Sequence, residues 1–348
     1  MRTERVPVGA LAGPPGRWVG GVLCRDVVGR DGRTVLPKGH RLERADDVLL
    51  DGAAPAPLHL LFLDAEDVDE ETAARRLAAV VAGPGVVTGR PVESQITCRA
   101  ATRGLVDLDA ELLGRLNAEP DVTVFTLPDG MPVDQGRAVA GVKVTPLAVG
   151  AAALDRAVAV VRDAGGPVLA VRPFSPLRIA VLVCEALPPP RRERFEQAVT
   201  AKVRWFGGTL GDIRYLPDRE AVDPEAIRAA AASADLLLIA GVASTDPLDA
   251  PWEAVMGAGA RVVRRGLPVH PGSSYWIVEL AGRPVVGVAS CGMFSRQTAL
   301  DLLLARYFTG QPLDPHYLGG LGHGGLLARE MAFRFPPYPD PPTDEEIP

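Results

Sequence analysis

The sequence predicts an α/β protein whose carboxyl-terminal part is a three-layer domain built on a mostly parallel sheet. Two apolar runs, RIAVLVC (178–184) and ADLLLIAG (234–241), lack the polar alternation of a half-exposed strand and therefore predict strands covered on both faces. Helical stretches separate the apolar runs, and strands that alternate with crossover helices are typical of parallel sheets. A small β-rich unit and an α+β segment are expected to precede this domain.

The amino-terminal half of the chain divides into these two parts by its pattern of apolar residues. Residues 1–65 predict a small β-rich unit, because clusters of Gly and Asp separate short apolar runs as they do in hairpins. Residues 66–173 predict an α+β segment that opens with a helix in DEETAARRLAAVVAG, where acidic residues come early and apolar residues recur at helical spacing. Strands at Val122–Leu127 and Ala138–Val149 and a helix at Leu154–Ala164 are expected to complete it.

Residues 174–327 are expected to form the three-layer domain. Besides the two buried strands, we expect further elements in this order: a helix at Glu193–Phe206, a strand near Thr209–Tyr215, helices at Pro224–Ser233 and Ala250–Met256, a strand in ARVVRRG, a hairpin in YWIVELAGRPVVGVAS and a last helix at Thr298–Phe308. Residues 328–348 are rich in proline and acidic residues, a composition that predicts a disordered tail.

The composition describes a folded chain and argues against several classes of protein. The 348 residues are 47% hydrophobic and 23% charged, enough for two or three domains with cores of their own. The 43 acidic residues outnumber the 37 basic ones without any block of like charge, which argues against nucleic-acid binding. No apolar run reaches the ~18–20 residues of a membrane span. The amino terminus lacks the apolar core of a signal peptide, and the four widely spaced cysteines form no CxxC pair, so we expect a cytoplasmic protein with reduced thiols.

The loops after the two buried strands are the first candidates for chemistry, because ligands of open α/β sheets bind outside the carboxyl ends of the strands. Glu185 directly follows the first strand. The loop Gly241–Asp249 follows the second, and Asp249 is placed to cap a helix whose amino terminus attracts phosphate. Asp246 is suited to hold a divalent metal that bridges such a phosphate. An ordinary capped turn is the alternative for both aspartates.

Three further glycine-containing turns are weaker candidates. The turn with Gly272–Ser274 offers backbone N–H groups and hydroxyls to an anion, and Ser290–Gly292 lies between a strand and a helix but lacks the lysine of a P-loop. No base is recognisable for Cys291, so a packed thiol is the alternative to a nucleophile. The five histidines show no HxxxH or HxH pair, which gives little support to a histidine metal site. His323, in a glycine-rich loop, is either an exposed loop residue or faces a ligand.

Three stretches of the carboxyl-terminal part together resemble the molybdopterin-binding domain shared by molybdopterin adenylyltransferases and molybdopterin molybdotransferases. They are LLLIAGVASTDPLDAPWEAVMGAGARVVRRGLPVHPGSSY, GRPVVGVASCGMFSRQTALDLLLARYFTGQPL and LGHGGLL. The last resembles the carboxyl-terminal signature of stand-alone bacterial and archaeal molybdopterin-binding proteins. GLVDLDAELLGRLN and VDQGRAVAGVKVTPL in the middle segment fit the same branch, so the resemblance covers most of residues 20–327.

This resemblance implies molybdopterin binding in the biosynthesis of the molybdenum cofactor. A catalytic member would be a transferase that inserts molybdate into adenylylated molybdopterin with the help of Mg²⁺. By the same resemblance, Glu185, Asp246 and Asp249 would be the catalytic and metal-binding residues. Small and hydroxyl-bearing residues would bind the pterin and its phosphate: Gly241, Ser244, Thr245, Gly272, Ser273, Ser274, Ser290 and Gly292.

Two alternatives use the same fold for other purposes. One is a non-catalytic carrier or sensor of the cofactor for a molybdenum hydroxylase apoenzyme, and the other is a metal-dependent pyrophosphatase. The first loop favours the carrier, because Leu182–Glu185 stands where the family has Thr-Gly-(Ser/Asp)-Glu. Ile239–Gly241 also departs from the family, which has Thr-Gly-Gly or Ser-Gly-Gly there. Dimers and trimers of related domains suggest a homo-oligomer.

Overall fold

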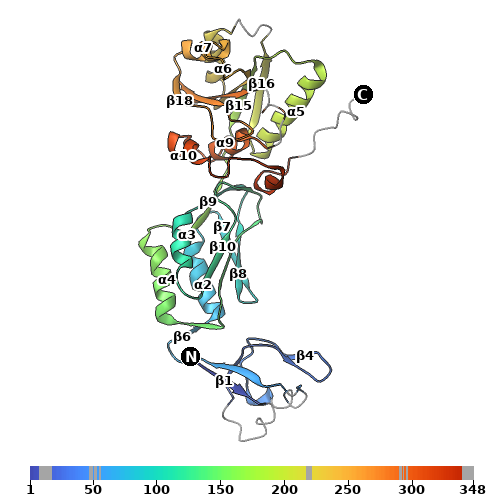
Figure 1. Ribbon diagram of the computed structural model, residues 1–348, viewed down its shortest axis with the longest axis vertical. Coiled ribbons are helices and arrows are strands. Elements are labelled where there is room, and N and C mark those ends of the chain that lie inside the picture. Colours follow the sequence, from blue (N-terminus) through green and yellow to red (C-terminus); the bar gives the residue numbers. More distant parts are fainter. Residues whose placement is uncertain are drawn as a thin grey trace. The chain divides into compact units, whose positions relative to one another are not determined.

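A computed structural model describes residues 1–7, 18–46, 50, 53–54, 56–216, 222–289, 292, 294 and 297–338. Figure 1 shows the helices and strands of the chain. Contacts between residues divide the chain into two compact units. The amino-terminal unit contains residues 1–101, 108–129 and 136–170, and the carboxyl-terminal unit contains residues 102–107, 130–135 and 171–348. The main boundary, at 170/171, lies close to the expected boundary at 173/174, whereas the expected boundary at 65/66 falls inside the amino-terminal unit.

The amino-terminal unit combines antiparallel sheets with three helices among its described residues. Its sheets have the strand orders β1-β5-β2, β3-β4, β10-β12-β8-β7 and β13-β6. The strands are β1 (Arg2–Val6), β2 (Val22–Leu23), β3 (Val27–Val28), β4 (Thr34–Leu36), β5 (Leu58–Phe62), β6 (Asp67–Asp69), β7 (Val86–Val92), β8 (Gln95–Ala100), β10 (Val122–Thr126), β12 (Ala138–Val144) and β13 (Ala148–Gly150). The helices are α2 (Glu70–Val81), α3 (Ala110–Asn117) and α4 (Ala151–Asp163), besides a 3-10 turn, η2 (Arg44–Asp46).

The carboxyl-terminal unit is built on a six-stranded sheet with the order β16-β15-β17-β20-β19-β18. Its strands are β15 (Arg178–Val183), β16 (Thr209–Tyr215), β17 (Leu236–Val242), β18 (Arg261–Arg265), β19 (Trp276–Leu280) and β20 (Arg283–Ala289). Its helices are α5 (Pro189–Trp205), α6 (Pro224–Ala232), α7 (Ala250–Gly257), α9 (Ala299–Tyr307) and α10 (Pro315–Gly320), followed by the 3-10 helix η3 (Arg329–Arg334). A separate three-stranded sheet has the order β11-β9-β14, made of β9 (Gly104–Leu108), β11 (Pro132–Val133) and β14 (Leu169–Pro173).

Strand pairing in the six-stranded sheet is mixed. The neighbours β16–β15, β15–β17 and β17–β20 are parallel, and β20–β19 and β19–β18 are antiparallel. The two apolar runs are therefore adjacent interior strands, as predicted from their continuous hydrophobicity. The chain as a whole mixes helices and sheets, as expected, but most of its sheets are antiparallel.

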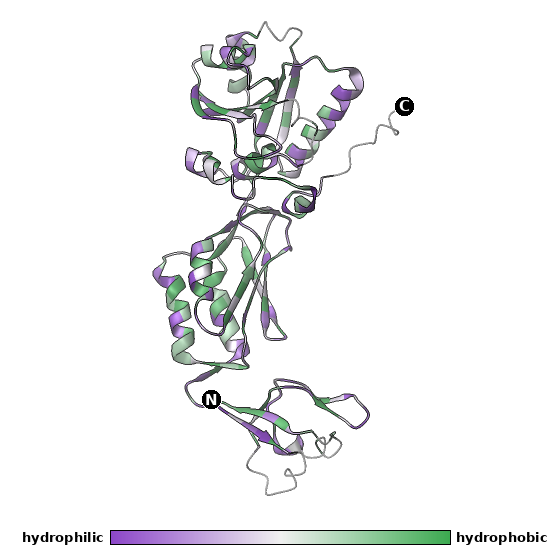
Figure 2. Ribbon diagram, viewed as in Figure 1, coloured by the Kyte–Doolittle hydropathy of each residue, from purple (hydrophilic) through white to green (hydrophobic). Residues whose placement is uncertain are grey.

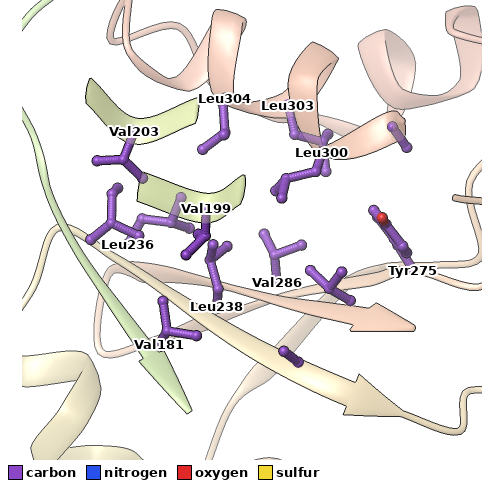
Figure 3. Close-up of a cluster of buried hydrophobic side chains, with 14 of the residues drawn as sticks. Val181, Val199, Val203, Leu236, Leu238, Tyr275, Val286, Leu300, Leu303 and Leu304 are labelled. Atoms are coloured by element: carbon purple, nitrogen blue, oxygen red, sulfur yellow. The ribbon is translucent and has the colours of Figure 1, made fainter. Parts of the chain in front are cut away.

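Alternate residues of β15 and β17 enter two different hydrophobic clusters, because successive side chains of a strand point to opposite faces. Val181 and Leu238 belong to one cluster, and Leu182 and Ile239 belong to the other. Figure 3 shows the first cluster, in which side chains of two helices point at the sheet: Val199 and Val203 of α5 and Leu300, Leu303 and Leu304 of α9. Much of α5 is hydrophilic (Figure 2), and its buried residues are Phe195, Val199, Lys202 and Val203.

Most predicted helices of this unit are present, with shifted ends. Helix α5 begins at Pro189, four residues before the expected Glu193, because prolines fit the first turn of a helix, where no N–H donor is needed. Helix α9 begins after Thr298, which forms a capping box with Asp301. Helix α10 was not predicted.

The expected disorder of residues 328–348 is wrong for residues 328–338. This segment contains η3, Phe335 is buried, and Tyr338 bonds to α9. Its composition suggested disorder, but specific contacts to the carboxyl-terminal unit hold it. Residues 339–348 lie outside the described part of the chain. Among the described residues, no helix combines the length and the apolar character needed to cross a membrane.

Candidate functional site

The carboxyl ends of β15, β17 and β20 bring the first candidate residues to one edge of the sheet. The strand registers align Val183 with Ala240 and Val242 with Ala289. Glu185 follows the end of β15, and Gly292 follows the end of β20 in the sequence. Gly241 still belongs to β17, so the loop expected at Gly241–Asp249 begins only after Val242. The carboxyl ends of the strands form the edge at which parallel α/β sheets bind their ligands.

Gly241 makes the closest approach between two of these segments. Its φ of +84° lies in the left-handed region, which glycine adopts without strain. A Cβ atom at this position would lie 2.6 Å from the Cβ of Glu185. The missing side chain therefore lets the end of β17 pass directly beside Glu185.

Asp249 closes the loop between β17 and α7. Its side chain is 3% exposed, and its Oδ2 accepts a hydrogen bond of 2.9 Å from the Ala243 amide. The residue occupies the N-cap position of α7, as predicted, but its side chain makes no bond to the helix amides. The N-cap position predicted for Asp249 is therefore confirmed, while its carboxylate bonds to the loop rather than to the helix.

The remaining polar groups of this loop differ in exposure. Asp246 is exposed, and its Oδ1 accepts a hydrogen bond of 2.9 Å from the Leu248 amide. Thr245 is exposed, whereas the Ser244 Oγ is buried and has no hydrogen-bond partner among the residues that the structure describes. The Arg265 guanidinium donates to the main-chain oxygens of Ser244 and Asp246, each at 3.4 Å. The Cζ atom of Arg265 also lies 4.4 Å from the ring centre of Trp252 in α7. Arg265, which belongs to β18, therefore contacts both the loop and the helix that follows it.

The turn His270–Ser274 packs against the start of α9. A Cβ atom at Gly272 would overlap the Cβ of Ala299, and the Ala299 amide donates to the Pro271 oxygen at 3.0 Å. The Tyr275 amide donates to the Gly272 oxygen, and an added Cβ at Gly292 would overlap the Tyr275 hydroxyl. Gly272 and Gly292 thus lie at the two ends of Tyr275, which is fully buried. Tyr275 was not a candidate in the sequence, because it opens an apolar hairpin.

The glycine-rich LGHGGLL segment pairs with the same turn. The His270 amide donates to the Gly325 oxygen, and the Leu327 amide donates to the His270 oxygen, each at 2.8 Å. His323 is exposed. Ser290 and Cys291 lie outside the described residues.

The three carboxylates expected to hold a metal are not gathered into a ligand set. Among the residues that the structure describes, no group of three His, Cys, Asp or Glu side chains could hold a metal ion. The Asp249 and Asp246 carboxylates instead bond to amides of their own loop. The described residues therefore show no grouping of Glu185, Asp246 and Asp249 around a metal, and the role expected for these three residues stays a prediction.

A scan against protein-family models and a search of curated proteins return no match for this sequence. Among solved structures, the chain is similar to two of a molybdopterin biosynthesis MoeA protein from Pyrococcus horikoshii. One has 12% identity and a TM-score of 0.29 over 89% of this chain and 75% of that chain. The other has 12% identity and a TM-score of 0.23 over 90% of this chain and 76% of that chain. Because both TM-scores are below 0.5, no function is transferred from these proteins.

Proposed function

We propose that this chain binds molybdopterin or its adenylate in the biosynthesis of the molybdenum cofactor, through a three-layer molybdopterin-binding domain. The observation that carries the proposal is the close approach of Gly241 to Glu185 at the carboxyl ends of two parallel strands. Gly241 lies within a segment whose sequence resembles the molybdopterin-binding domain, and Glu185 matches the glutamate of the family's first loop. The ligand would bind along the edge formed by the ends of β15, β17 and β20.

The loop after β17 has the properties of a phosphate-binding loop. It opens with the small residues Ala243, Ser244 and Thr245, so a ligand can approach its backbone there, and it leads into the amino terminus of α7. The side chain of Asp249, the N-cap residue, makes no hydrogen bond to the helix amides, and the partial positive charge of a helix amino terminus favours an anion. Thr245 offers an exposed hydroxyl, and Ser244 offers a second hydroxyl once its side chain rotates toward the ligand.

Binding without catalysis is the form of this function that the residues favour. The family positions that carry hydroxyls or glycines are occupied here by Leu182, Val183, Ile239 and Ala240, all buried strand residues. The expected Mg²⁺ ligands are not gathered among the described residues, so we derive no metal-assisted step. A carrier or sensor that serves a molybdenum hydroxylase fits these features, and a molybdate-inserting transferase is the second candidate.

The ligand that accompanies the protein from a host that makes the cofactor tests this proposal. We expect mass spectrometry of the denatured extract to detect molybdopterin, its adenylate or the finished cofactor, which differ in mass. The same preparation from a host unable to make the pterin should contain none of them. Recovery of nucleotides alone would favour the pyrophosphatase, and absence of any pterin from the producing host would overturn the proposal.

A further inference from the structure

Hydrogen bonds of Arg334 and Tyr338 attach the carboxyl-terminal segment 328–338 to other described residues of its unit. The Arg334 guanidinium donates to the Gly324 oxygen at 3.0 Å. The Tyr338 hydroxyl donates to Asp301 Oδ1 at 2.7 Å. The buried Phe335 lies between these two residues in the sequence.

The Tyr338 hydrogen bond joins a buried ion pair at the start of α9. Lys202 of α5 and Asp301 of α9 form an ion pair of 2.5 Å, and their side chains are 4% and 1% exposed. The Lys202 ammonium also lies 4.7 Å from the centre of the Tyr338 ring. Asp301 Oδ2 accepts from the amide and the hydroxyl of Thr298, so this one carboxylate receives donors from α5, from the helix cap and from the tail.

Tyr338 is suited to be a permanent donor in this network. Burial, together with the negative charge of Asp301, raises the pKa of Tyr338 well above its usual value, so the phenol stays protonated. A hydrogen bond from a neutral donor to a buried carboxylate is among the stronger ones in proteins. Removal of the Tyr338 hydroxyl would leave Asp301 with fewer donors to offset its buried charge.

Both attachment points lead to the turn His270–Ser274. Gly324, which accepts from Arg334, directly precedes Gly325, whose oxygen accepts from the His270 amide. Asp301, which accepts from Tyr338, caps the helix whose first residue, Ala299, packs against Gly272 and donates to Pro271. Segment 328–338 is therefore bonded to two elements that contact this turn, the LGHGGLL segment and the start of α9.

We propose that residues 328–338 are a brace that positions the His270–Ser274 turn through Arg334 and Tyr338. Both are positioning residues, because they act on the turn through Gly324 and Asp301. A consequence for ligand binding rests on the proposed function, in which this turn forms part of the cradle. The brace itself is tested without any ligand, so its failure is distinguishable from failure of the proposed function.

Hydrogen exchange of the full chain tests the brace. In Tyr338→Phe we expect the Ala299, Asp301 and Tyr275 amides to exchange about tenfold faster or more, the effect of losing a hydrogen bond to a charged group. In Arg334→Gln we expect the same for the His270 and Leu327 amides. Amides of α6 should keep their wild-type rates in both variants.

Two matched variants control for general effects of these substitutions. Tyr307→Phe removes a phenol at the other end of α9 that donates to the Asp235 oxygen at 2.8 Å, and it should leave the Ala299 and Tyr275 amides unchanged. Arg329→Gln changes an exposed arginine of the same 3-10 helix and should leave the His270 amide unchanged. Unchanged exchange in both test variants would overturn the proposal. So would a uniform increase that includes α6, which would make the tail a general stabiliser.

Discussion

At the scale of single residues, the stability cost of the close contact between Gly241 and Glu185 can be measured, because Gly259 is a matched control for Gly241. Gly241 and Gly259 have nearly equal φ angles, +84° and +89°, but a Cβ at Gly259 would meet no atom within 4 Å. Gly259→Ala should cost only the backbone strain, about 1–2 kcal/mol. Gly241→Ala should cost about 1–3 kcal/mol more, since its Cβ must displace Glu185. Urea unfolding measures both, and equal losses would show that Glu185 gives way without cost.

The two aspartates of the β17–α7 loop differ in burial, which their spacing in the sequence does not reveal. Asp249 is buried and accepts from Ala243, so Asp249→Ala should lower the free energy of unfolding by about 2–3 kcal/mol, since it leaves a partly buried amide without its acceptor. Asp246 is exposed, so Asp246→Ala should cost less than about 1 kcal/mol. Urea titrations of the two variants side by side decide this. A larger loss for Asp246→Ala would mean that Asp249 does not close the loop.

At the scale of elements, the sequence predicted those strands and helices whose signal lies in neighbouring residues. Strands β15 and β17 could be recognised because every residue from Ile179 to Val183 and from Leu236 to Val242 is buried, which leaves a continuous apolar run in the sequence. The start of α9 could be recognised because Thr298 and Asp301 lie three residues apart. The order of residues 328–338 could not, since it depends on partners such as Asp301, 37 positions away from Tyr338.

Strand β8 of the amino-terminal unit carries a thiol that the structure predicts to be unreactive. Cys98 is fully buried, and burial raises its pKa to about 11. Since the thiolate is the reactive form, the folded protein at pH 8 should not be alkylated at Cys98 within the time that modifies the partly buried Cys24. Peptide mass spectrometry after iodoacetamide treatment measures both. Equal modification of the two would show that β8 opens readily in the native state.

At the scale of the whole molecule, topology predicted which segments share an edge but not how their side chains are used. The alternation of strands and helices was enough to place Glu185 beside the Gly241 loop, because parallel neighbours end on the same side. It could not show that Asp249 turns away from α7, or that Tyr275 lies against Gly292, because both depend on the packing of side chains. The same limit explains why three carboxylates near strand ends suggested a metal set that the described residues do not form.

Titration of the purified protein with molybdopterin tests the proposed molybdopterin site most directly. We expect saturable binding by the wild-type chain and at least about tenfold weaker binding by Thr245→Ala, which removes an exposed hydroxyl from the loop that we propose to bind phosphate. Ser233→Ala is the matched control: its hydroxyl donates to the Ala230 oxygen at the end of α6, and its loss should leave the affinity unchanged. Absence of binding by the wild type, or equal affinity of Thr245→Ala and the wild type, would contradict a molybdopterin site at the ends of β15, β17 and β20.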